Sequence, residues 1–109
     1  MMEGKAVIGE TDMLPTMQQD ALRLAAKALD HFDITDSTEI ARFIKMEFDC
    51  LYGPGWQCIV GTDFGSFVTH CCGCFIYFGI GSLAILLFRG GSAPEYDTDR
   101  LIDMKTVKA

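Results

Sequence analysis

The stretch that decides the fold runs from Trp56 to Arg89 and reads WQCIVGTDFGSFVTHCCGCFIYFGIGSLAILLFR. Between residues 64 and 88 it contains no Asp, Glu, Lys or Arg. A run of this kind is typical either of strands that are buried on both faces or of a single membrane span, which needs ~20 mainly apolar residues. The function of the protein depends on which of the two holds.

The middle of this run favours strands over a membrane helix. His70 and several glycines would lie at mid-depth, where they weaken a helix and make its insertion costly. Turn-like residues at 62–65, 71–73 and 79–82 divide the run into pieces of strand length. The sequence therefore predicts an antiparallel meander of four strands: Trp56–Gly61, Ser66–His70, Cys74–Phe78 and Leu83–Phe88.

Two amphipathic helices are predicted before this stretch, after a short strand at Lys5–Gly9. Pro15 suits the first turn of the first helix. Its apolar stripe is Met17, Ala21, Leu24, Ala25, Ala28 and Phe32. Asp36 and Glu39 resemble a capping box at the start of the second helix, which Gly53 and Pro54 end. The second stripe is Ile40, Ile44, Phe48 and Leu51. This order predicts an α+β fold, with two helices packed on an antiparallel sheet.

Size and composition restrict the class of protein. The 109 residues fit one domain, which we place at residues 1–91, and the Gly-, Pro- and charge-rich tail at 92–109 is predicted to be disordered. The net charge of −6 argues against a nucleic-acid partner. The first ten residues have no apolar core of a signal peptide, so we expect five reduced cysteines in a cytoplasmic protein that binds no membrane.

One cluster of side chains could bind a metal or act as a nucleophile: His70, Cys71, Cys72 and Cys74. Adjacent cysteines in a tight turn point apart, and no second CxxC-like pair is present, so zinc is disfavoured. A Cys-His nucleophile would need an acidic group to orient the imidazole, and none is close in sequence. We expect neither an enzyme nor a cofactor. A thiol-based redox or metal-binding role for the cluster stays open as the alternative function.

The apolar strands suggest how the protein associates. Two helices cover one face of the sheet, so a second copy of the chain is the simplest cover for the other face, and we expect a symmetric homodimer. The free edge of such a sheet can also accept an extended peptide as an additional strand.

Several motifs, taken in order over residues 5 to 89, resemble the dynein light chain type 1 family, the small LC-eight class. They are Lys5-Ala6-Val7-Ile8, Asp12-Met13, Met17-Gln18-Gln19-Asp20, Glu47-Phe48-Asp49, Trp56, Cys58-Ile59-Val60-Gly61, Phe64-Gly65-Ser66, Val68-Thr69-His70, Phe75-Ile76-Tyr77-Phe78 and Ala84-Ile85-Leu86-Leu87-Phe88. The agreement of many motifs in one order is highly specific.

The resemblance implies a non-catalytic, homodimeric hub or motor light chain. Its subunits would exchange the strand 64–70 and bind short linear motifs, often containing Thr-Gln-Thr, which promotes dimerisation of the partner. The implied peptide-binding residues are Phe64, Gly65, Ser66, Phe67, Val68, Thr69, His70, Phe75, Tyr77, Ala84, Leu86, Ser37 and Thr38. The implied dimer interface includes Gln57, Phe64, Ser66 and Val68. The dynein intermediate chain is an implied partner, and the implied location is cytoplasmic and associated with the microtubule cytoskeleton.

The sequence also departs from the family pattern. Phe67 and Gly79 stand where the family usually has tyrosine, and Gln57 stands where it usually has histidine. A cysteine-rich turn at 71–74 replaces an acidic-basic one, and the lysine at the start of the second helix is replaced within residues 36–38. We therefore expect the fold to be kept and the peptide preference to be altered.

Overall fold

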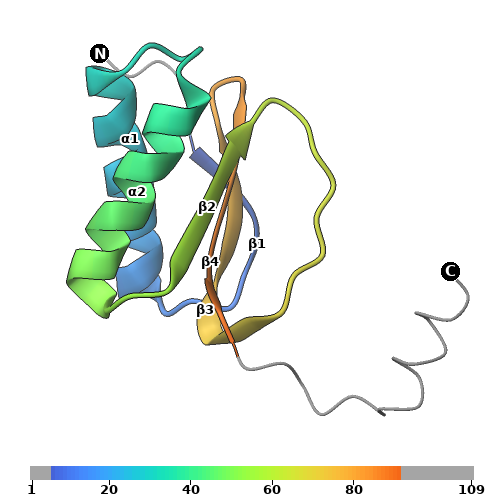
Figure 1. The fold of residues 1–109 in the computed structure, drawn as a ribbon. Helices are drawn as coiled ribbons and strands as arrows, with labels where there is room; N and C mark the ends of the chain where they lie inside the picture. Colours follow the sequence, from blue (N-terminus) through green and yellow to red (C-terminus); the bar gives the residue numbers. More distant parts are fainter. Residues whose placement is uncertain (1–5, 92–109) are drawn as a thin grey trace, which may run out of the picture.

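The computed structural model describes residues 6–91, and the tail at 92–109 lies outside these described residues. In chain order the elements are β1 (Ala6–Thr11), α1 (Pro15–His31), α2 (Ser37–Tyr52), β2 (Trp56–Gly61), β3 (His70–Ile80) and β4 (Leu83–Gly90). The strands form one antiparallel sheet in the order β1-β3-β4-β2. Both helices pack on the same face of that sheet (Figure 1). The predicted α+β fold is confirmed, while the predicted strand exchange between two copies stays a prediction.

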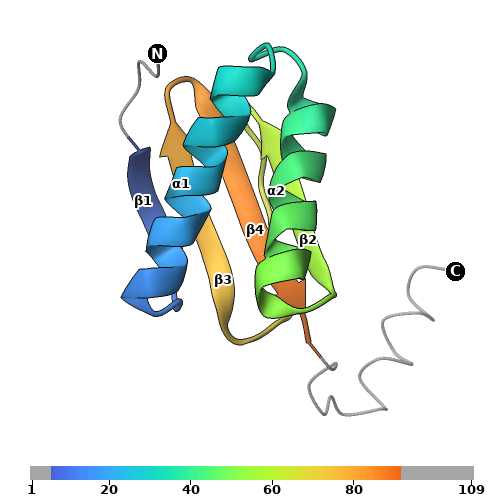
Figure 2. The ribbon, with the colours of Figure 1, turned by 90° about the vertical axis from the view of Figure 1, so that its left-hand side faces the viewer.

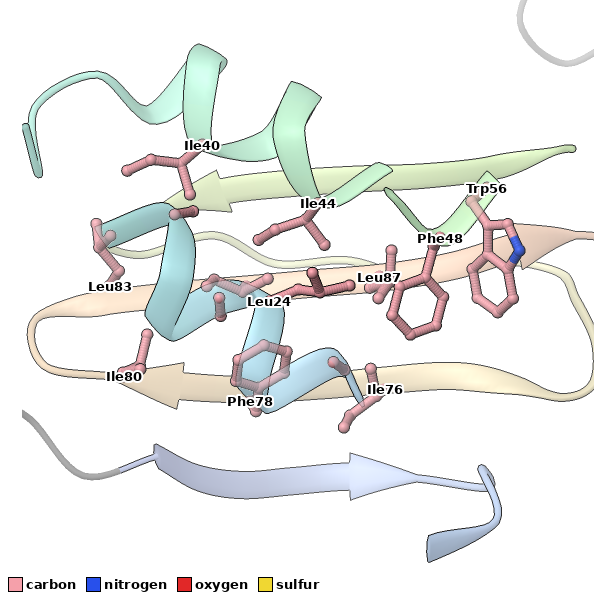
Figure 3. Packing of buried hydrophobic residues seen from close by; sticks show 14 of the residues in the cluster. Leu24, Ile40, Ile44, Phe48, Trp56, Ile76, Phe78, Ile80, Leu83 and Leu87 are labelled. Atoms are coloured by element: carbon pink, nitrogen blue, oxygen red, sulfur yellow. The ribbon is translucent and has the colours of Figure 1, made fainter. Parts of the chain in front are cut away.

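The core lies between the helices and the sheet. The view onto the helix layer shows α1 and α2 side by side in front of the strands (Figure 2). Figure 3 shows the buried side chains of the helices meeting those of the strands, with Phe48 and Trp56 together at one end. Their rings lie 4.8 Å apart in an edge-to-face arrangement. The alternate residues Ile76, Phe78 and Ile80 of β3 are buried, as the period of a one-sided strand requires.

The helices follow the sequence prediction closely. Pro15 occupies the first turn of α1, and the stripe residues Ala21, Leu24, Ala25 and Ala28 are buried. In α2 the prediction is wrong for Leu51, which is 50% exposed. The ring of Tyr52 takes the place predicted for Leu51, with its centroid 5.0 Å from that of Phe48.

The predicted capping box at the start of α2 is also wrong, because the side chain of Asp36 makes no capping hydrogen bond. Its backbone has φ −90° and ψ 57°, outside the extended region from which an N-cap side chain reaches back to the helix N–H groups. The first N–H groups of α2 therefore lack a side-chain cap, whereas Gly53, with φ 93°, ends the helix as predicted.

The sheet differs from the predicted meander in three ways. The strand β2 pairs with β4 and not with β3, so the chain must cross from one side of β4 to the other. Residues 62–69, which contain most of the predicted strand Ser66–His70, form no strand in the single chain, and only His70 belongs to one. The predicted turn at 71–73 is an irregularity inside β3, where the register shifts between His70 and Phe75 and Gly73 has φ 78°.

The alternative of a membrane-spanning helix is not supported by the described helices. No helix within residues 6–91 is long and apolar enough to cross a bilayer. The uncharged run of the sequence is accounted for by β3 and β4, whose helix-facing side chains are buried.

Candidate peptide-binding site

An extended segment, residues 62–69, connects β2 to β3. Figure 1 shows it bowing away from the sheet. Phe64 holds its first half against the sheet, because its ring lies 5.9 Å from that of Tyr77 in an edge-to-face arrangement. Phe67, in its second half, is 101% exposed. Phe67 therefore projects into solvent from a backbone that lies outside the sheet.

A cleft of about 440 Å³ lies between this segment, the open face of the sheet and the end of β1. It brings together seven of the residues that the sequence assigned to peptide binding: Phe64, Ser66, Phe67, Val68, His70, Phe75 and Tyr77. Glu10, Thr11 and Asp12 also line it. The sequence reasoning missed these three, although the pairing of β1 with β3 places them beside Phe75 and Tyr77.

Hydrogen bonds fix the end of β1 against β3 at this cleft. The hydroxyl of Thr11 donates to the carbonyl of Phe75 at 2.7 Å and accepts the N–H of Met13 at 3.0 Å. A carboxylate oxygen of Asp12 accepts the N–H of Gly73 at 2.8 Å. The irregular part of β3 is therefore tied down by β1, which gives the cleft a defined wall.

His70 lines the cleft close to Asp12. Its ring stacks on Phe75 at a centroid distance of 4.8 Å and an interplanar angle of 21°. Its Nδ1 lies 2.8 Å from the carbonyl of Cys71 and 3.9 Å from the carboxylate of Asp12. The cleft is thus lined by aromatic side chains, two carboxylates and one imidazole.

The other residues assigned to peptide binding lie elsewhere in the single chain. Leu86 pairs with Tyr77 and is fully buried, and Ala84 pairs with Gly79. Ser37 lines a separate depression of about 420 Å³ beside Gly61, Thr62 and Ser82. Thr38 and the interface candidate Gln57 line another, of about 560 Å³, between α2 and β2. Gly65 and Thr69 lie in the extended segment, outside the lining of the cleft.

A row of small residues crosses the sheet next to Tyr77. The register sets Val7 opposite Gly79, Gly79 opposite Ala84, and Ala84 opposite Gly61. An added Cβ at Gly79 would meet only the carbonyl oxygen of Leu83, at an ordinary distance of 3.5 Å. The backbone at Gly79 therefore leaves room for a larger side chain than the sequence supplies.

The thiols do not assemble into a reactive centre. All five cysteines are free. Burial raises the pKa of the Cys58 thiol to about 12, and burial followed by the neighbouring Cys71 raises that of Cys74. Raised pKa values keep these thiols protonated and poorly nucleophilic. In residues 6–91 no three His, Cys, Asp or Glu side chains come together as metal ligands.

The fold and the site together define a class: a small α+β domain with an extended segment beside an aromatic cleft. The family model described as dynein light chain type 1 matches residues 5–90. The chain belongs to the dynein light chain type 1 family. That membership supports a light-chain or adaptor role, and the family is generally non-catalytic.

Solved structures show the same fold. The dynein light chain-like domain of the Fasciola hepatica calcium-binding protein FhCaBP2 is 23% identical, with a TM-score of 0.64 over 82% of this chain and 94% of that domain. A mercury derivative of it gives 22% identity and a TM-score of 0.67, over 80% of this chain and 93% of that one. The light chain-like domain of CsTAL3 is 18% identical, with a TM-score of 0.54 over 77% and 90%. At identities this low, the likeness shows the fold alone.

Proposed function

We propose that this protein is a non-catalytic homodimeric adaptor that binds short linear peptides by strand addition and so pairs two copies of a partner. The observation that carries the proposal is the extended segment 62–69, with Phe67 fully exposed beside an aromatic cleft. Family membership supports the same role. The proposal includes a cytoplasmic, cytoskeleton-linked location and the dynein intermediate chain as a candidate partner.

Dimerisation is supported by two complementary features of the one chain. The strand β2 is an edge of the sheet, so one side of its backbone is open to a further strand. The depression of about 560 Å³ beside it is lined by Ala41, Met46 and Cys58, which offer apolar contacts. The segment 62–69 of a second copy supplies both an unpaired backbone and, at Phe67, an apolar side chain to fill such a depression. Exchange of this segment would pair the open backbone edge of β2 and fill the depression beside it.

Peptide binding is supported by the cleft and by the start of α2. The backbone of residues 62–69 makes no backbone hydrogen bond to the rest of residues 6–91 and can pair with an added peptide. The uncapped N–H groups around Ser37 and Thr38 can donate hydrogen bonds to a side-chain amide oxygen of the ligand, such as that of the glutamine in Thr-Gln-Thr. In this proposal the exchange brings the segment of one copy towards the α2 of the other, so that Ala84, Leu86, Ser37 and Thr38 join the cleft residues.

Light scattering at micromolar concentration tests the dimer. We expect twice the 12.0 kDa mass of the chain for the parent, and partial or full dissociation for Phe67→Ser. Leu14→Ser is the matched control, because Leu14 is also an exposed apolar residue, at 74%, but lies at the start of α1. A monomeric parent, or equal dissociation of the two variants, would contradict the proposed exchange.

Fluorescence anisotropy with a labelled Thr-Gln-Thr peptide tests the peptide site. Val68→Pro removes one backbone donor from the extended segment, so we expect weaker binding by about 1 kcal/mol, roughly fivefold, and light scattering of the same variant shows whether its dimer is kept. Unchanged affinity would argue against strand addition at this segment. The alternative thiol or metal role receives no support from the arrangement of the cysteines.

A further inference from the structure

The irregular part of β3 lies directly after a residue of the cleft. The ladder between β3 and β4 shifts its register between His70 and Phe75. Residues 71–74 there stand opposite the single residue Arg89, and such extra residues leave the ladder and lose its hydrogen bonds. Because His70 lines the cleft, its position depends on what holds the residues that follow it.

Asp12 makes the contact that holds these residues. One oxygen of its carboxylate accepts the backbone N–H of Gly73 at 2.8 Å, and the same oxygen lies 3.9 Å from Nδ1 of His70. Asp12 is itself fixed, because its backbone N–H donates to the carbonyl of Phe75 at 3.2 Å. The end of β1 therefore ties the irregular residues to the point where the regular ladder resumes.

The irregular residues in turn orient the ring of His70. Its Nδ1 lies 2.8 Å from the carbonyl oxygen of Cys71. A carbonyl only accepts hydrogen bonds, so Nδ1 carries the proton and donates it. The other ring nitrogen, Nε2, is then an acceptor in the neutral imidazole. Stacking on Phe75, at a centroid distance of 4.8 Å, holds the ring in this orientation.

We propose that Asp12 is a positioning residue for His70, and that the imidazole held in this way accepts a hydrogen bond at Nε2 from an N–H or O–H donor of the bound peptide. Asp12 acts through the backbone of residues 71–73. These contacts belong to β1 and β3, so they do not depend on the exchange of residues 62–69. The recognition of a peptide donor rests on the proposed peptide-binding function, whereas the positioning of His70 does not.

Long-range ¹H–¹⁵N NMR of the peptide-free protein, at a pH where His70 is neutral, tests the positioning. In the parent we expect the proton on Nδ1. Asp12→Ala removes the acceptor of the Gly73 N–H and should shift His70 towards the mixture of tautomers of an unconstrained imidazole. Asp12→Asn keeps an oxygen acceptor and should keep the proton on Nδ1. Glu10→Ala is the matched control, because Glu10 also lines the cleft but pairs with Tyr77, and it should leave the tautomer unchanged.

Fluorescence anisotropy with the labelled Thr-Gln-Thr peptide tests the recognition of a donor. His70→Ala removes one hydrogen-bond acceptor and should weaken binding roughly fivefold. Asp12→Ala should weaken binding by a similar factor. The double variant should bind no more weakly than either single variant, because Asp12 acts through His70.

Two results would overturn the positioning: a proton on Nε2 of His70 in the parent, or the same tautomer in Asp12→Ala as in the parent. Unchanged affinity of His70→Ala, or losses that add in the double variant, would overturn the recognition of a peptide donor. Absence of measurable binding by the parent would contradict the proposed peptide-binding function and the donor recognition that rests on it. The tautomer measurement would still decide the positioning in that case.

Discussion

Tyr52→Phe provides a test of the contact that joins the two helices. The hydroxyl of Tyr52 donates to the carboxylate of Asp20 at 2.5 Å, across 32 residues of sequence. Asp20 also accepts Arg23 at 3.3 Å. The ring of Tyr52 packs 5.0 Å from Phe48 and 6.3 Å from Trp56. Phenylalanine keeps the ring contacts, so the variant removes the hydrogen bond alone.

The expected loss follows from the charge and exposure of this pair. A hydrogen bond to a charged group contributes about 1.5–3 kcal/mol. The Asp20 side chain is 26% exposed, so water replaces the lost donor in part and the loss should be nearer about 1–1.5 kcal/mol. For a domain of this size this corresponds to a fall in Tm of about 5 °C.

The two pKa shifts show over which pH range this contact stabilises the fold. The Tyr52 hydroxyl lowers the pKa of Asp20, so the contribution is present above the ordinary carboxyl pKa of about 3.9 and is lost as the pH falls below it. The hydrogen bond to Asp20, with burial, raises the pKa of Tyr52 to about 12, so the contribution is present below about pH 10 and is lost as the pH rises towards 12. Both shifts describe one interaction, which is counted once.

Urea denaturation followed by circular dichroism, at one fixed protein concentration, measures the effect. A double-mutant cycle with Asp20→Ala isolates the coupling between the two side chains. We expect the coupling to be constant between pH 5 and pH 9, in round numbers, and to shrink outside that range. A coupling near zero at neutral pH, or a loss that is unchanged at pH 3, would refute this reasoning.

Three further predictions concern other sites. Asp49→Ala should lower the free energy of unfolding by about 1.5–2 kcal/mol in urea denaturation, because the Asp49 carboxylate accepts a hydrogen bond from the backbone N–H of Trp56 at 3.0 Å. A loss below about 0.5 kcal/mol would contradict this prediction. Because Gln57 does not titrate, the dimer mass from sedimentation should be the same at neutral and mildly acidic pH; dissociation at mildly acidic pH would contradict this prediction. Gly79→Tyr should bind the labelled Thr-Gln-Thr peptide about fivefold more tightly, since an aromatic wall adds ~1 kcal/mol; equal affinity in anisotropy would show that Gly79 is not a specificity determinant.

The helices were predictable because their signals are local. Pro15 at the start of α1, the stripes at helical spacing and the glycine after α2 each act within one or two turns, and the structure confirms them. The capping role of Asp36 failed because a side-chain hydrogen bond depends on the local φ and ψ, which residue type alone does not determine. The prediction that Leu51 is buried was wrong because the ring of Tyr52 packs on Phe48 in its place.

The candidate site was predictable only through family resemblance and only in part. The cleft joins residues from β1, the extended segment and β3, and this meeting depends on the strand order β1-β3-β4-β2. Glu10 and Asp12 belong to it because β1 pairs with β3 across more than 60 residues of sequence. Such long-range pairing has no local signature, which is why the sequence pointed to a meander instead.

The failed strand at 66–70 follows from the same physics that supports the proposed dimer. Val68 and Thr69 are β-branched and Phe67 is aromatic, so the segment has the composition of a strand. A strand also requires a neighbour to pair with its N–H and C=O groups, and within residues 6–91 this segment has none. A segment with strong strand propensity but no backbone partner is a candidate for pairing with another molecule. We therefore expect residues 62–69 to complete their structure against a second chain or a bound peptide, and not within the sheet that they leave.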